Sequence, residues 1–141
     1  MIALDTNVLV HAHRADSPWH KRALEQVATL GGSRWAIPWP CLHEFLAIVT
    51  HPKIFNPPTP LEDAMLTVEG WIGSPLVTLL GELDGYYDAL ASLLRTGRVV
   101  GPRVHDARVA ALCLQHGVTE LWTMDRDFSR FPQLRTRNPF V

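Results

Sequence analysis

Short apolar runs alternate along the chain with longer segments of helical periodicity. A short apolar run bounded by turn residues is typical of a buried strand, whereas apolar residues that recur every three or four positions predict an amphipathic helix. We therefore predict strands at residues 2–5, 34–37, 76–80 and 121–123, and a further edge strand near 138–141. Helices are expected at residues 8–14, 19–30, 40–50, 61–72, 85–96 and 105–116.

The order of these elements predicts the fold class. Strands that alternate with helices form mainly parallel sheets, because the chain returns to the same edge of the sheet through each helix. We expect an α/β fold, a three-layer α/β/α sandwich around a mainly parallel sheet of four to five strands. With 141 residues, of which 47% are hydrophobic, the chain fits a single domain, residues 1–141, with a sizeable core.

Composition and charge narrow the classes of protein that are compatible with the chain. No basic leader precedes an apolar stretch, and no apolar run approaches the roughly 18 residues of a membrane span, so we expect a cytoplasmic protein without a membrane partner. The formal net charge is −1 and the pI is near 6.6, so any surface that binds nucleic acid must be local. Cys41 and Cys113 lie in apolar helical patterns and are predicted core residues. Core or interface positions are expected for Trp35, Trp39 and Trp71.

Acidic residues lie where predicted strands end and helices begin. Asp5 follows the first strand, Asp125 and Asp127 follow the fourth, and Asp106 opens the helix at 105–116. Glu44 lies at the flank of the apolar stripe of the helix at 40–50. Each has an ordinary alternative role, as a helix cap, a solvated side chain or a turn former. Asp106 is the least ordinary, because it lies on the apolar side of its helix, where a carboxylate needs a partner or a cation.

Considered together, these carboxylates predict a metal site. In a parallel sheet, side chains that follow the strands gather at the same edge, where ligands bind. Carboxylates about 4 Å apart repel one another by roughly 1 to 4 kcal/mol per pair, so a cluster retains protons or binds a cation. Hard cations such as Mg²⁺ or Mn²⁺ prefer oxygen ligands and keep several waters, which leaves room for a phosphate. The sequence thus favours a metal-dependent nuclease.

The chain resembles PIN domains and, among them, the VapC-type ribonuclease toxins of bacterial type II toxin-antitoxin pairs. The resemblance runs almost from end to end. It rests most specifically on the opening segment Ile2-Ala3-Leu4-Asp5-Thr6-Asn7 and on the closing segment Leu121-Trp122-Thr123-Met124-Asp125-Arg126-Asp127-Phe128. Between them lie the helix that carries Glu44 and the helix start His105-Asp106-Ala107.

The resemblance implies a PIN-like fold and an endoribonuclease that hydrolyses RNA phosphodiester bonds with a metal-activated water. The implied catalytic and metal-binding residues are Asp5, Glu44, Asp106 and Asp125, with Mg²⁺ or Mn²⁺ as cofactor. Supporting roles are implied for the Thr6 and Thr123 hydroxyls, the Asn7 amide and Asp127. Whether Asp125 or Asp127 is the fourth acidic ligand stays open.

Partners are also implied by the resemblance: an RNA substrate, a cognate VapB-like antitoxin protein and a second copy of the chain in a homodimer. A local basic feature is consistent with RNA binding. Arg126, Arg130, Arg135 and Arg137 lie within the last sixteen residues, where they are candidates for phosphate contacts at the rim of the acidic site. The alternative is a solvated C-terminal segment with internal ion pairs.

Two other functions start from the same residues. Phosphatases of the haloacid-dehalogenase type also have an aspartate after the first strand, but they use a second aspartate two residues later as acid and base. Position 7 is Asn in this chain, which disfavours that chemistry. A non-catalytic RNA-binding PIN domain is the second alternative, and the four carboxylates argue against it.

Overall fold

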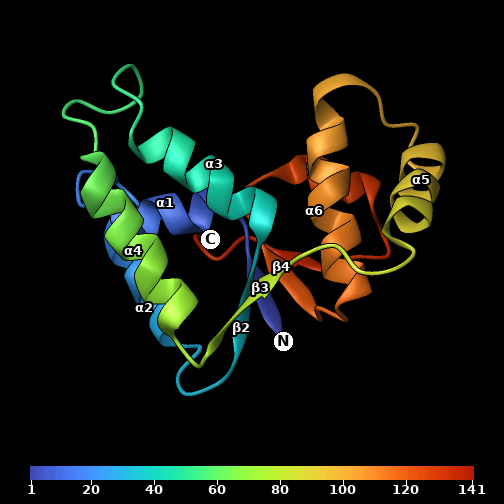
Figure 1. Cartoon of the computed structure of the whole chain (residues 1–141), viewed down its shortest axis with the longest axis horizontal. Coiled ribbons are helices and arrows are strands. Elements are labelled where there is room, and N and C mark those ends of the chain that lie inside the picture. Colours follow the sequence, from blue (N-terminus) through green and yellow to red (C-terminus); the bar gives the residue numbers. More distant parts are fainter.

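The computed structural model describes residues 1–141 and confirms the alternating order of strands and helices (Figure 1). The strands are β1 (Ile2–Leu4), β2 (Trp35–Pro38), β3 (Val77–Leu80), β4 (Glu120–Trp122) and β5 (Thr136–Arg137). The helices are α1 (Thr6–His13), α2 (His20–Ala28), α3 (Trp39–Val49), α4 (Leu61–Gly73), α5 (Tyr86–Thr96) and α6 (Val104–Gln115). Two 3₁₀ turns complete the chain, η1 (Gly101–Arg103) and η2 (Arg126–Arg130).

The start of helix α1 and the position of the edge strand differ from the prediction, and in both cases a polar side chain explains the difference. Helix α1 begins at Thr6 rather than at residue 8, because the Asp5 carboxylate accepts the Thr6 backbone N–H at 2.8 Å and caps the helix. The edge strand lies at Thr136–Arg137 rather than at 138–141. Asn138 ends it, because the side chain of Asn138 accepts the Phe140 backbone N–H at 2.9 Å and turns the chain.

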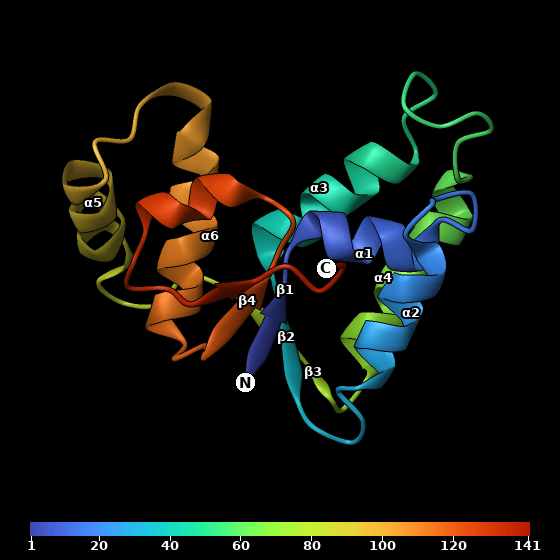
Figure 2. The ribbon, with the colours of Figure 1, turned by 180° about the vertical axis from the view of Figure 1, so that it is seen from behind.

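All five strands are parallel, in the order β3-β2-β1-β4-β5. Helices α1 to α4 lie on one side of the sheet, and α5 and α6 lie on the other (Figures 1 and 2). This arrangement confirms the predicted three-layer α/β/α sandwich. The chain moves outward from β1 to β2 and β3 and then returns to β4 on the other side of β1. The strand order therefore reverses between β1 and β4, and a crevice at their carboxyl ends is the usual ligand site of such sheets.

Helix α3 shows how the sequence places one side chain towards solvent. Pro40 fits the first turn, where no hydrogen-bonded N–H is lost. Leu42, Phe45 and Val49 recur at helical spacing and are buried, which leaves Glu44 exposed on the opposite side. The packing of the apolar stripe thereby fixes the position of Glu44.

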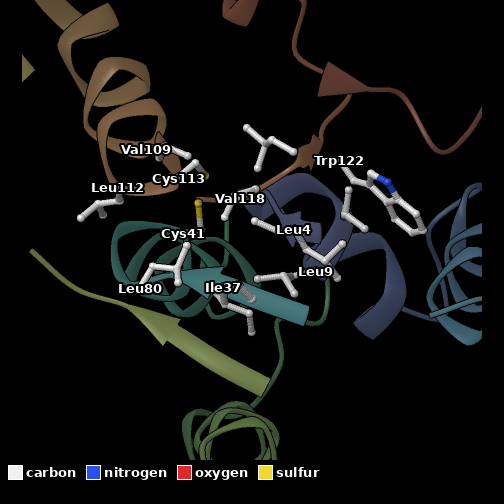
Figure 3. Close-up of a cluster of buried hydrophobic side chains, with 14 of the residues drawn as sticks. Leu4, Leu9, Ile37, Cys41, Leu80, Val109, Leu112, Cys113, Val118 and Trp122 are labelled. Atoms are coloured by element: carbon white, nitrogen blue, oxygen red, sulfur yellow. The ribbon is translucent and has the colours of Figure 1, made fainter. Parts of the chain in front are cut away.

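The buried core confirms the assignment of both cysteines. Cys41 and Cys113 are free thiols and lie among apolar side chains such as Leu80 and Leu112 (Figure 3). Trp35 and Trp71 pack against the core, but Trp39, the first residue of α3, is 37% exposed and lies outside it. Trp39 therefore does not occupy a core position, and the interface position that the sequence offered as the alternative stays a prediction. None of the helices is both long and apolar enough to cross a bilayer.

Candidate metal centre

A central cleft of about 220 Å³ opens beyond the carboxyl ends of β1 and β4. The structure brings Asp5, Glu44, Asp106 and Asp125 together as lining residues of this central cleft. They come from four places in the fold: the end of β1, the exposed side of α3, the first turn of α6 and the segment after β4. Side chains up to 120 residues apart in the sequence thus share one cavity (Asp5 and Asp125).

Asp5 is the most deeply buried carboxylate, with 7% of the residue exposed. Its Oδ1 accepts the Thr6 backbone N–H at 2.8 Å and the Cys41 thiol at 3.4 Å. Its Oδ2 accepts the Thr123 hydroxyl at 2.7 Å and the Asn7 amide at 3.2 Å. Burial raises the pKa of Asp5 above its ordinary value, while the hydrogen bonds from Thr123, Thr6 and Cys41 oppose that rise. These donors fix the position of the carboxylate and favour its ionised form, while burial has the larger influence and keeps the pKa of Asp5 raised.

Asn7 connects the start of α1 to the segment after β4. Its Oδ1 accepts the Met124 backbone N–H at 3.1 Å. Because a backbone N–H can only donate, this contact fixes the amide orientation and directs the NH₂ group to Asp5 and to the Thr123 hydroxyl, each at 3.2 Å. An amide held in this way cannot take up or release a proton, so position 7 cannot serve as the acid and base of a haloacid-dehalogenase phosphatase.

Three aspartates lie closest to one another. Asp106, Asp125 and Asp127 each offer a carboxylate oxygen, and these oxygens lie within 4.8 Å of one another. The Thr123 hydroxyl accepts the backbone N–H of Asp125 at 3.0 Å and so positions this residue. The Asp125 carboxylate accepts the backbone N–H of Asp127 at 2.8 Å. A set of oxygen donors at this spacing fits a hard divalent cation. Both candidates for the fourth ligand, Asp125 and Asp127, thus belong to this group.

Glu44 and Asp127 have further contacts that restrict them. The Glu44 carboxylate accepts the Thr6 hydroxyl at 3.1 Å, which ties α3 to the start of α1. Asp127 forms an ion pair with Arg103 of η1 at 3.0 Å. Sequence reasoning missed Arg103, because nothing local links it to a residue that is 24 positions away.

Sequence reasoning also missed two other neighbours of the cleft. His11 lines it, and its ring Nδ1 lies 2.6 Å from the Ser17 hydroxyl. Helical spacing could have indicated His11, because it follows Asn7 by four residues on the same side of α1. Cys41 was assigned to the core correctly, but its thiol also bonds Asp5.

The four predicted RNA-binding arginines do not line the cleft. Arg135 pairs with Glu120 at 3.0 Å, and Arg137 donates to Gln26 at 3.1 Å while its guanidinium lies 5.2 Å from the Trp122 ring centroid. These internal contacts match the alternative that the sequence left open for the C-terminal segment. Arg126 is exposed, and Arg130 donates to the Gly97 carbonyl at 3.4 Å.

Asp106 has a raised pKa, because it is partly buried and lies among the other carboxylates of the cluster. Partial burial and the surrounding carboxylates, Asp125 first and then Asp5, Asp127 and Glu44, raise the pKa of Asp106 from 3.8 to about 6. The native state thus takes up a proton here that the unfolded chain does not bind between about pH 6 and pH 4. The free energy of unfolding that protonated Asp106 contributes at low pH is lost as the pH rises through 6.

We expect this loss to be measurable as a pH dependence of the melting temperature. In EDTA, Asp106→Asn should melt about 3 °C above the wild type at pH 8, because roughly 1 kcal/mol remains after allowance for solvent screening of a partly exposed group. The difference should vanish towards pH 4. Asp88→Asn, which removes the acidic residue from the first turn of α5, controls for the loss of a charge at a helix start. Equal melting temperatures at pH 8 would exclude strain at Asp106.

The fold and the site together define a class of protein: an α/β domain that presents clustered carboxylates at the switch point of a parallel sheet. The chain belongs to the PIN domain family, whose model matches residues 2–134. It is similar to Ribonuclease VapC48 of Mycobacterium tuberculosis, with 33% identity over 138 residues, which cover 96% of this chain and 95% of that protein. Similarity to Ribonuclease VapC43 of the same organism is also 33%, over 142 residues that cover 99% of this chain and 95% of that protein.

Solved structures agree on the fold. Mycobacterium tuberculosis VapC20, described as a sarcin-ricin loop cleaving toxin, superimposes with a TM-score of 0.68 at 18% identity and covers 92% of this chain and 93% of that one. VapBC2 from Rickettsia felis, bound to a DNA fragment from its promoter, superimposes with a TM-score of 0.66 at 20% identity and covers 98% of both chains. The PIN-like fold expected from the sequence is confirmed.

Proposed function

We propose that this protein is a metal-dependent endoribonuclease that hydrolyses RNA phosphodiester bonds and is the toxin of a VapBC-type toxin-antitoxin pair. The observation that carries the proposal is the gathering of Asp5, Glu44, Asp106 and Asp125 in one cleft, with Asp127 beside them. The relatives at 33% identity are named ribonucleases, which supports RNA as the substrate.

Asp106 and Asp125 are the proposed ligands of Mg²⁺ or Mn²⁺, with Asp127 next to them and Asp5 and Glu44 reaching the ion directly or through water. When bound, such an ion neutralises phosphate charge and lowers the pKa of a bound water. The chain's own contribution is positioning. Thr123 and Asn7 hold Asp5, Thr6 holds Glu44, and the Thr123 hydroxyl holds the backbone of Asp125.

A nucleophile from the protein is not required in this proposal. Cys41 is the thiol nearest to the site, but it is buried and donates to Asp5. Burial, reinforced by the nearby Asp5 charge, raises the pKa of the Cys41 thiol well above its ordinary value, so it stays protonated. Water is therefore the attacking group that the site supports best.

Partners follow from the same proposal. The VapBC2 complex of Rickettsia felis is a relative in fold, and an unregulated ribonuclease would damage its own cell. We expect a VapB-like antitoxin to bind this chain, and we expect a homodimer to cover some of the apolar side chains that α4 exposes, such as Leu61 and Leu66. Co-purification of a small partner protein would support the antitoxin, and a harmless, fully active monomer would count against it.

Metal removal tests the proposal directly. The purified chain should cleave labelled single-stranded RNA in Mg²⁺ or Mn²⁺, lose that cleavage in excess EDTA, and recover it when the metal is restored. The cation is expected to be essential because several kcal/mol of charge stabilisation come from it. Gel analysis of the products at increasing times measures the rate. Cleavage that persists unchanged in EDTA, or no cleavage with either metal, would refute the proposal.

A further inference from the structure

A groove continues beyond the central cleft, and most of its lining residues come from α3 and α6. These two helices lie next to each other in the fold (Figure 1). A flanking cleft of about 400 Å³ shares Asp5, Glu44 and Asp106 with the central cleft. An outer cleft of about 390 Å³ shares Pro40, His43 and Arg108 with the flanking cleft. We call these two clefts the side groove.

The side groove differs in chemistry from the central cleft. No lysine or arginine lines the central cleft, whereas the side groove is lined by Arg108, His43 and His105. Arg108 takes part in none of the ion pairs of the molecule, and its side chain contacts the His105 ring, at 3.5 Å, and the Tyr86 hydroxyl. Its charge is thus not neutralised by a carboxylate, directly beside a cleft lined by four of them.

An exposed aromatic side chain lies at the outer end of the same groove. Trp39 lines the outer cleft and is 37% exposed, while Trp122, by contrast, is 1% exposed. The ring centroid of Trp39 lies 5.8 Å from that of His43, and the two ring planes form an angle of 38°. The Cδ1 atom of the indole lies 3.6 Å from the position that a Cβ at residue 81 would take, an ordinary van der Waals distance, so the ring packs beside Gly81. The indole ring thus has His43 and Gly81 as neighbours and keeps part of its surface exposed.

We propose that the side groove binds one nucleotide of single-stranded RNA next to the phosphate that is cleaved, with its base stacked on Trp39 and its phosphate on Arg108. Aromatic stacking and a basic contact are the usual means of binding single strands without reading their sequence. Arg108 is the only arginine or lysine among the residues that line the side groove, so the groove provides one strong phosphate contact. This assignment rests on the proposed ribonuclease function and identifies how that site holds its substrate.

Binding of a fluorescein-labelled hexaadenylate RNA, followed by anisotropy, tests the proposal without cleavage. Every protein in this experiment carries Asp106→Asn, which prevents cleavage, and the protein with this substitution alone is the parent. Binding is measured in Mg²⁺ at a series of salt concentrations. Adding Trp39→Ala should weaken binding roughly tenfold, the effect of one lost stacking contact, and Trp39→Phe should retain most of the affinity. Tyr87→Ala, which removes an exposed aromatic residue of α5 outside the groove, should leave binding unchanged.

Arg108→Gln should reduce the slope of log K against log salt by about 0.7, because one phosphate contact is lost from a single strand. Arg95→Gln, an exposed arginine at the end of α5, is the matched control and should leave the slope unchanged. Binding and salt slope equal to the parent in both groove variants, or no measurable binding by the parent, would overturn the side-groove assignment. Failure of the ribonuclease function is seen separately, as the absence of metal-dependent cleavage by the wild type.

Discussion

Replacing Asp106 by Asn is expected to lower the rate of RNA cleavage by about 10²- to 10⁴-fold, the equivalent of several kcal/mol of lost charge stabilisation. The reason is geometric. Asp106 supplies one of three oxygens within 4.8 Å of one another, and it also lines the central cleft with Asp5 and Glu44. No other acidic side chain belongs to both groups except Asp125. An amide at this position keeps the shape but loses the charge that attracts a cation.

Initial rates on labelled RNA in saturating Mg²⁺ measure this effect, and a metal titration separates weaker metal binding from slower chemistry. The Asp88→Asn control, which changes the same residue type at the same helical position in α5, should cleave like the wild type. Because the metal-free Asp106→Asn protein is expected to melt above the wild type at pH 8, loss of activity cannot be explained by unfolding. Cleavage within threefold of the wild type would remove Asp106 from the proposed ligands.

Replacing Asn7 by Asp is expected to lower the free energy of unfolding of the metal-free protein at pH 8 by about 2 to 4 kcal/mol. The change is isosteric, but it replaces an NH₂ donor by a carboxylate oxygen 3.2 Å from Asp5 Oδ2. Two hydrogen bonds from the amide are lost, one to Asp5 and one to the Thr123 hydroxyl, and two like charges face each other in a partly buried site. The repulsion raises the pKa of the pair in the native state, so the lost stability should return as the pH falls.

Urea unfolding at pH 8 and pH 5 measures the effect of Asn7→Asp. Asn138→Asp is the matched control, because the Asn138 side chain only accepts a hydrogen bond, from the Phe140 N–H, and a carboxylate can do the same. Asn7→Asp also distinguishes phosphatase chemistry from nuclease chemistry. A haloacid-dehalogenase phosphatase needs an aspartate at position 7 and would gain phosphatase activity, whereas the proposed nuclease gains none. Wild-type stability at pH 8 would mean that Asn7 does not donate to Asp5.

Much of the fold could be predicted because local chemistry specifies it. The apolar spacing of Leu42, Phe45 and Val49 defines α3 and its exposed side, and Pro40 marks its start. The edge strand was placed too late, because it is only two residues long and is formed by pairing with β4, not by its own apolar pattern. Such a strand has almost no signal of its own in the sequence.

The residues of the candidate site also fall into those that the sequence predicted and those that it did not. Asp5, Asp106 and Asp125 were found because a polar residue after a strand or at a helix start is a local feature. Glu44 was found at the flank of the apolar stripe of its helix, and the resemblance to PIN domains grouped it with the other three. The ion pair of Arg103 with Asp127 was not found. It depends on how η1 packs beside the segment after β4, and no periodicity records that packing.

The sequence by itself determined the strands and helices, their alternation, and the positions at which carboxylates leave them, since all of these follow from interactions between residues a few positions apart. The tertiary structure alone decided the spacing of those carboxylates. It put Asp127 in a group with Asp106 and Asp125, surrounded Asp5 with four donors, and left Arg108 without an ion pair in a groove that also contains the exposed Trp39. Electrostatic interactions fall off over a few ångströms, so they depend on the angles at which distant elements pack, and the chain fixes those angles only when the whole core forms.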